Sequence, residues 1–297
     1  MGVLRLLLLL PALAALINAQ SLQGTIDMHV HAAPDGSPRS IDAIDLARLA
    51  KTRGMRAIVF KSHKESTAAM VYLVHKEVPG IEVFGGIGLD LEVGGLNAAA
   101  VEWMTKMTGG YGRVIWFPTY DAEAQVKRSG ENRPFVSVVK DDKVVPEATQ
   151  VLEVAARHNL VFETGHSSPA EGLLLIREAK RVGVKSIVVT HALTNMGGRY
   201  TVPQMREAAD LGAFLEVVWG RGNVLRESAD AVKAVGARHF IVSSDLGQPN
   251  NPLHPDGLME IYKSFAQQGI SLTDIELMSK TNPALALGLA VNPEANK

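Results

Sequence analysis

The sequence predicts an α/β fold, a (β/α)8 TIM barrel with a hairpin inserted after the fourth strand. Short apolar runs alternate eight times with amphipathic segments, which is the pattern of a strand followed by a covering helix. Several runs are apolar almost throughout, as parallel strands are when helices cover both faces of their sheet. A doubly wound open sheet is the alternative, but it would normally carry a glycine-rich first turn, and no GxGxxG motif follows the first run.

The eight expected strands are rich in β-branched residues and are bounded by turn-forming or polar ones. They cover residues 24–32, 55–63, 81–90, 112–120, 160–166, 185–192, 213–220 and 239–247.

Two of the intervening segments show clear helix boundaries. The stretch 40–54 has apolar residues at helical spacing behind Ser40, which is its expected N-cap. The stretch 168–183 is expected to begin at Ser168, with proline at the first helical position, and to end at Gly183.

One polar segment, residues 121–147, does not fit the repeat of strand and helix. Its second half, "FVSVVKDDKVV", predicts a hairpin that turns near Asp141 and Asp142. A loop that follows a barrel strand projects over the C-terminal face, so this insertion is expected to be either a lid over the site or a surface decoration.

The N-terminus has the pattern of a secretory signal peptide. Arg5 precedes an apolar stretch over residues 6–17, and Ala19 is the expected last residue removed. We therefore expect residues 1–19 to be cleaved and the protein to be exported, either periplasmic or secreted. An uncleaved membrane anchor is the alternative, although the stretch is shorter than the roughly 20 residues of a spanning helix. Residues 20–297 are then expected to form a single barrel domain.

Composition narrows the partners and the chemistry. A formal net charge of −1 with no basic stripe argues against nucleic acid. The chain has no cysteine, so a metal would need histidine, aspartate, glutamate or lysine ligands. We expect a small-molecule substrate and no membrane contact after signal cleavage. The sequence leaves open whether the chain forms a homo-oligomer.

The placement of the histidines predicts the functional site. The chain has nine, and five of them fall at the C-terminal ends of expected strands, which is the rim where barrel enzymes build active sites. These five are His29, His31, His63, His166 and His191. Asp245 ends the eighth strand in the same way. A cluster of histidines with a carboxylate predicts a metal or catalytic centre.

His29 and His31 are expected to act together at one site. Side chains two apart on a strand point to the same face, so both can reach one cation from the inward side. Imidazole and carboxylate ligands suit zinc best, with iron, manganese or nickel as alternatives.

With these residues in place, the chain resembles the amidohydrolase superfamily of metal-dependent hydrolases. The resemblance covers nearly all of residues 20–297 and includes "DMHVH" on the first strand and the closing "LMSKTNPALALGL". His166, His191 and Asp245 match the superfamily on the fifth, sixth and eighth strands. The phrases "FKSHKEST" and "SSDLGQPNNPLHPDG" are similar to a branch for which the resemblance implies no particular substrate.

The resemblance implies a role for each matching residue. His29 and His31 would bind the more buried metal, and Asp245 would complete its coordination and take a proton from the attacking water. His166 and His191 would bind a second metal, or one of them would ligate while the other polarises the substrate. The number of metals, one or two, stays open.

The sequence departs from the superfamily at the end of the fourth strand, where a bridging anionic ligand is usual and "VIWFPTY" stands instead. Lys61 could replace it as a carboxylated lysine or act as an electrostatic clamp, and a salt-bridged barrel lysine is the alternative. Glu163 is the second possible substitute as a ligand. It lies three residues before His166, however, so strand alternation favours a position facing away from the site.

The leading hypothesis is a metal-dependent hydrolase in which metal-activated water attacks an amide, ester or lactone bond. Asp245 would be its base, and Lys61, His63 or His191 would stabilise the developing oxyanion. A metal-dependent decarboxylase or lyase is the second hypothesis. A non-catalytic exported protein that binds a metal or ligand is the third, and the presence of Asp245 argues against it.

Overall fold

The computed structural model describes residues 21–291. The expected signal peptide, residues 1–19, lies outside the described residues. Within them, no helix combines the length and the apolar composition that crossing a bilayer requires.

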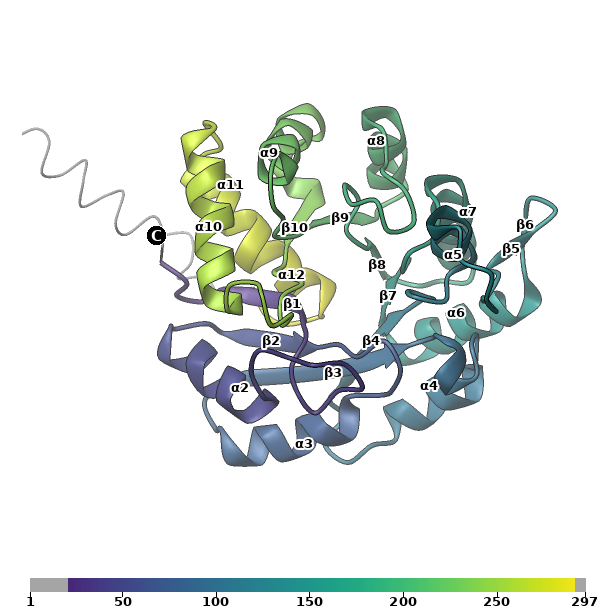
Figure 1. Ribbon diagram of the computed structural model, residues 1–297, viewed down its shortest axis with the longest axis horizontal. Helices are drawn as coiled ribbons and strands as arrows, with labels where there is room; N and C mark the ends of the chain where they lie inside the picture. The colour runs from purple at the N-terminus through teal and green to yellow at the C-terminus, as the bar shows by residue number, and fades with distance from the viewer. Residues whose placement is uncertain (1–20, 292–297) are drawn as a thin grey trace, which may run out of the picture.

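An eight-stranded parallel sheet forms the centre of the molecule, with helices around it (Figure 1). Every neighbouring pair of its strands is parallel. In sheet order the strands are β1 (Ile26–Val30), β2 (Ala57–Phe60), β3 (Glu82–Gly88), β4 (Gly112–Trp116), β7 (Val161–Glu163), β8 (Ser186–Val189), β9 (Phe214–Val217) and β10 (Phe240–Val242). Each lies within one of the eight predicted runs, so the prediction of a (β/α)8 barrel is confirmed.

The sheet closes between its first and last strands. Val30 bridges to Leu246 in the parallel sense, and Asp245 N–H donates to the His29 carbonyl at 2.9 Å. Closure therefore uses the residues just beyond β10. It places Asp245 beside the end of β1, although more than 200 residues separate the two in the sequence.

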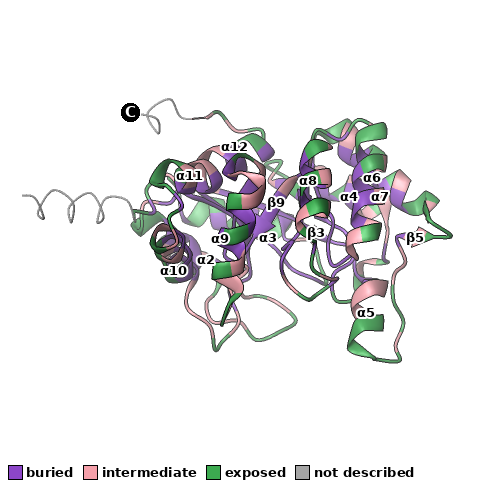
Figure 2. Ribbon diagram, turned by 90° about the horizontal axis from the view of Figure 1, so that it is seen from above, coloured by how far each residue is buried: buried purple, intermediate pink, exposed green. Residues whose placement is uncertain are grey.

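The helices follow the strands around the outside of the barrel. They are α2 (Ala43–Thr52), α3 (Ala68–Glu77), α4 (Ala98–Thr105), α5 (Glu123–Ser129), α6 (Pro146–His158), α7 (Pro169–Arg181), α8 (Val202–Asp210), α9 (Val224–Val235), α10 (His254–Gln267), α11 (Leu272–Glu276) and α12 (Asn282–Ala286). Their buried residues turn toward the sheet and their exposed residues face outward (Figure 2).

The predicted helix boundaries hold at α7 but not at α2. Ser168 caps α7 in a reciprocal capping box with Glu171. Ser40 does not cap α2: its N–H donates to the Gly247 carbonyl at 2.8 Å, so the chain is still part of the loop that follows β1. The helix begins at Ala43, two residues later than a cap at Ser40 would place it. Its cap is Asp42, whose side chain accepts from Asp45 N–H at 2.9 Å.

The insertion after β4 contains the predicted hairpin. Strands β5 (Val139–Lys140) and β6 (Lys143–Val144) pair antiparallel, with Asp141 and Asp142 at the turn, both at positive φ. Helix α5 precedes this hairpin and belongs to the same insertion, and β4 pairs directly with β7.

Apolar side chains from most of the strands form a second buried cluster, distinct from the one between sheet and helices. It contains Met28, Val59, Trp116 and Ile241, with Leu287 just beyond α12. Because strands all around the sheet contribute, this cluster fills the interior of the barrel. The polar side chains of the interior therefore lie at its other end, near the C-terminal ends of the strands.

Candidate metal centre

The predicted residues of the first two strands and the last strand meet at the C-terminal mouth of the barrel. His29 is on β1, His31 follows it by two residues, Lys61 comes directly after β2, and Asp245 lies three residues beyond β10. The histidines and Lys61 are buried, and 23% of the Asp245 side chain is exposed. The two rings lie 5.2 Å apart, centroid to centroid.

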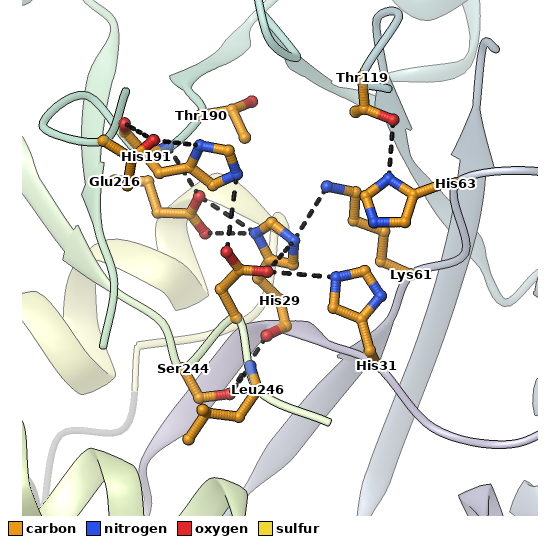
Figure 3. A network of polar contacts seen from close by, with 12 residues as sticks. His29, His31, Lys61, His63, Thr119, Thr190, His191, Glu216, Ser244 and Leu246 are labelled. Carbon is orange, nitrogen blue, oxygen red and sulfur yellow. Dashed lines mark hydrogen bonds and ion pairs between the residues drawn. The ribbon is translucent and has the colours of Figure 1, made fainter. Parts of the chain in front are cut away.

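Asp245 Oδ1 is the point on which the two histidines converge. It lies 3.1 Å from His29 Nε2 and 3.2 Å from His31 Nε2. Figure 3 shows His29 with His31 and Lys61 beside it. Lys61 Nζ lies 3.0 Å from His29 Nε2. Ligands about 2.0–2.1 Å from a tetrahedral zinc lie roughly 3.3–3.4 Å from one another. The two imidazole nitrogens and the carboxylate oxygen are therefore placed to hold a single divalent cation.

His166 and His191 follow β7 and β8 at the same mouth of the barrel. Their ring centroids are 4.8 Å apart, and His191 Nε2 is 3.7 Å from Asp245 Oδ2. His166 Nε2 is buried and has no hydrogen-bond partner among residues 21–291. A buried ring nitrogen without a partner is costly unless a ligand or substrate completes it.

Four of the five histidines are held through Nδ1. The Nδ1 partners are Glu216 for His29, Thr119 for His63, Gln125 for His166 and Thr194 for His191, and the first three of these accept. When Nδ1 carries the hydrogen, Nε2 keeps its lone pair. The surroundings thus prepare several Nε2 atoms for a cation or a substrate, as outer partners do in metal sites.

His63 shows how this tautomer is fixed. The Thr119 hydroxyl lies 2.5 Å from Asp90 Oδ2 and 2.8 Å from His63 Nδ1. Since it donates its single hydrogen to the carboxylate, it accepts from His63 Nδ1–H. The His63 ring stacks between His31, at 4.8 Å, and Tyr120, at 4.0 Å, so it forms a wall of the site.

Two buried carboxylates that belong to the cluster were not predicted to face it. Glu216 on β9 lies in an apolar run and was overlooked; its Oε2 is 3.2 Å from His29 Nδ1. The prediction for Glu163 is wrong, because its carboxylate lies within 4.8 Å of ligand atoms of both His29 and Glu216. Strand alternation does not extend from Glu163 to His166, because β7 ends at Glu163 and the chain turns at Gly165, whose φ is 63°.

The histidines of the site differ in protonation. Burial lowers the pKa of His31 to about 3 and that of His191 to about 4, so both rings are neutral at pH 7. Burial and Lys61 would lower the pKa of His29, but Asp245 and Glu216 outweigh them and raise it to about 10. Burial would raise the pKa of Asp245, yet His29 and its hydrogen bond hold it well below its usual range.

The pKa values of the buried side chains Lys61, Glu163 and Glu216 are shifted in different directions. Burial lowers the pKa of Lys61, against the opposing effect of Asp245. Burial, followed by the charge of Glu216, raises the pKa of Glu163 to about 8. Burial would also raise the pKa of Glu216, but His29 lowers it below its ordinary value. The cluster thus concentrates negative charge on Asp245 and Glu216, next to His29.

The family model that matches the chain covers residues 24–216 and is described as a family of unknown function (DUF6282). The chain belongs to this family. Those residues carry every candidate ligand except Asp245. No curated protein matches this DUF6282 chain.

Solved structures share the barrel at low sequence identity. An amidohydrolase from Pseudomonas aeruginosa is 11% identical, with a TM-score of 0.64 over 91% of this chain and 97% of that one. The organophosphorus hydrolase from Deinococcus radiodurans is 16% identical, with a TM-score of 0.62 over 91% and 94%. An amidohydrolase from Burkholderia multivorans with bound zinc is 14% identical, with a TM-score of 0.61 over 90% and 99%. These likenesses establish that this DUF6282 chain has the amidohydrolase fold.

Proposed function

We propose that this protein is a metal-dependent hydrolase that cleaves an amide, ester or lactone bond of a small molecule. The observation that carries the proposal is the convergence of His29 Nε2 and His31 Nε2 on Asp245 Oδ1, at 3.1 and 3.2 Å. A zinc-bound relative of the same fold supports zinc as the cation. Donors of this kind favour zinc over calcium or magnesium, which prefer oxygen ligands.

Such a cation would lower the pKa of bound water from 15.7 to about 7 and would polarise the bond under attack. Asp245 would hold the cation through Oδ1, the atom near both histidines, and its second oxygen, Oδ2, would be left to accept a proton. The same carboxyl can return the proton to the leaving group. Lys61, His63 and His191 surround this point, so they are the candidates for stabilising negative charge on the substrate oxygen.

The test is chelator-sensitive turnover in a screen of small amides, esters and lactones with zinc-loaded protein. We expect hydrolysis that disappears with a chelator and returns with zinc. Asp245→Asn keeps the shape of the side chain but removes its basicity, and should lower turnover about a hundredfold or more. His158→Ala, which changes a histidine on the outer helix α6, is the matched control. Tight, reversible ligand binding without any product would contradict the proposal.

A further inference from the structure

Glu216 is a carboxylate that contacts two of the candidate histidines away from the mouth of the barrel. It lies on β9 and is fully buried. Both of its oxygens lie near His29 Nδ1, Oε1 at 3.3 Å and Oε2 at 3.2 Å. Oε2 also accepts the backbone N–H of His191 at 3.1 Å. Figure 3 shows it between these two residues.

The contact with His29 differs in kind from the other Nδ1 contacts. Thr119, Gln125 and Thr194 are neutral partners, whereas Glu216 is an anion. A carboxylate that accepts Nδ1–H fixes the ring and makes the opposite nitrogen a stronger ligand. His29 is also the histidine closest to Asp245 Oδ1 and Lys61 Nζ, at the centre of the cluster.

The contact with His191 supports a strained turn. The backbone of His191 has a φ of 29°, in the left-handed region that favours glycine. A non-glycine residue keeps such a conformation only when its surroundings impose it. The bond from its N–H to Glu216 Oε2 supplies one such constraint, and the His191 side chain then reaches toward Asp245.

We propose that Glu216 is a positioning residue: it fixes the orientation of the His29 ring toward the metal and the backbone turn that places the His191 ring near the substrate. One oxygen of a carboxylate can serve both contacts because it has two lone pairs. A glutamine could place its oxygen at the Oε2 position, but its amide nitrogen would then stand at the Oε1 position, 3.3 Å from His29 Nδ1, and the negative charge beside the ring would be lost. This inference rests on the proposed metal-dependent function, but it can fail separately.

The test compares zinc affinity in the wild type, Glu216→Gln and Glu163→Gln by competition with a coloured chelator. Loss of the orienting carboxylate should weaken zinc about 10- to 100-fold in Glu216→Gln. Glu163→Gln is a comparison within the same cluster, because it changes an equally buried glutamate whose hydrogen bond is to Thr190 and not to a histidine. Glu178→Gln, on the outer helix α7, is the control outside the site. The effect of Glu163→Gln on zinc affinity should be smaller than that of Glu216→Gln, and Glu178→Gln should leave it unchanged. The visible spectrum of the cobalt-loaded protein should change only in Glu216→Gln, which a merely stabilising role would not produce.

Each outcome decides between the proposals. Zinc bound equally by wild type and Glu216→Gln, with the same cobalt spectrum, would overturn the positioning role and leave the metal site intact. A wild type that binds no metal would overturn both. Equal losses in Glu163→Gln and Glu216→Gln would also overturn the positioning role, because Glu163 makes no hydrogen bond to a histidine within residues 21–291. If Glu216→Gln does not fold, Glu216→Asp decides: it keeps the charge but withdraws the oxygens, and undiminished zinc affinity would refute the role.

Discussion

The two sides of the barrel mouth use the same residue type in different ways. On the β1 side, defined as His29, His31 and Asp245, two ring nitrogens approach one carboxylate oxygen within 3.2 Å. On the β7–β8 side, defined as His166 and His191, the nearest carboxylate oxygen to His191 Nε2 is 3.7 Å away. His166 Nε2 has no hydrogen-bond partner within the described part of the chain.

From this difference we infer which histidines would hold a cation and which would face a substrate. The β1 side has a shared anion and a charged partner behind His29, and both favour a metal. The β7–β8 side has neutral partners, Gln125 and Thr194, and belongs to no group of three close ligand atoms within residues 21–291. We therefore expect one tightly bound metal, on the β1 side, with the β7–β8 side acting on the substrate.

Removing the β1 side should have the largest effect. The double variant His29→Ala/His31→Ala loses two of the three expected ligands, so it should bind no metal and show no turnover while the barrel remains folded. Elemental analysis measures the metal, and circular dichroism measures the fold. A double variant of the helical histidines, His75→Ala/His158→Ala, is the control. Full metal occupancy in the first variant would refute the assignment.

Replacing Lys61 tests whether the two sides share a bridging ligand. Its amine lies 3.0 Å from His29 Nε2. With a single metal, Lys61→Met should keep one metal per chain and lower turnover about 10²- to 10³-fold, through lost stabilisation of the oxyanion.

The Lys61→Met variant is tested by elemental analysis of its metal content and by steady-state kinetics. A metal content that falls by half, and that short carboxylic acids restore, would show instead that Lys61 is a carbamate bridging two metals. The comparison of the two sides would then need revision.

The fold and the β1 side could be predicted because they follow simple periodicities. Apolar runs with helical segments between them define all eight strands, and alternation correctly places His29 and His31 together. The same rule failed at Glu163, because a turn at Gly165 separates it from His166. Alternation describes a strand only as far as the strand continues.

Other features depend on long-range closure, which a single sequence does not reveal. Glu216 looks like an interruption in an apolar run, and only the packing of β9 near β1 brings it to His29. Similarly, Ser40 has the residue type of a helix cap, but closure binds its N–H to the loop beyond β10. The metal and catalytic roles of these residues stay predictions.

The pH dependence of metal binding should distinguish the two sides. Asp245 and Glu216 raise the pKa of His29 to about 10, despite burial and Lys61, whereas burial lowers that of His191 to about 4. At pH 7, a metal on the β1 side must therefore displace a proton, and its affinity should rise about tenfold per pH unit below 10. Calorimetry in buffers of different ionisation enthalpy should show about one proton released per metal. A metal affinity that stays the same between about pH 6 and pH 8 would instead place the metal on rings that are already neutral.

The smallest expected effect concerns Gln125, which lies on α5 in the inserted segment and accepts from His166 Nδ1. Loss of one hydrogen bond of about 1 kcal/mol should lower turnover in Gln125→Ala roughly fivefold. Metal content should not change, because His166 is expected to face the substrate. Gln125→Glu retains an acceptor and is the matched control, so it should restore most of the turnover. Loss of metal in Gln125→Ala would instead make His166 a ligand, and would remove the distinction between the two sides of the mouth.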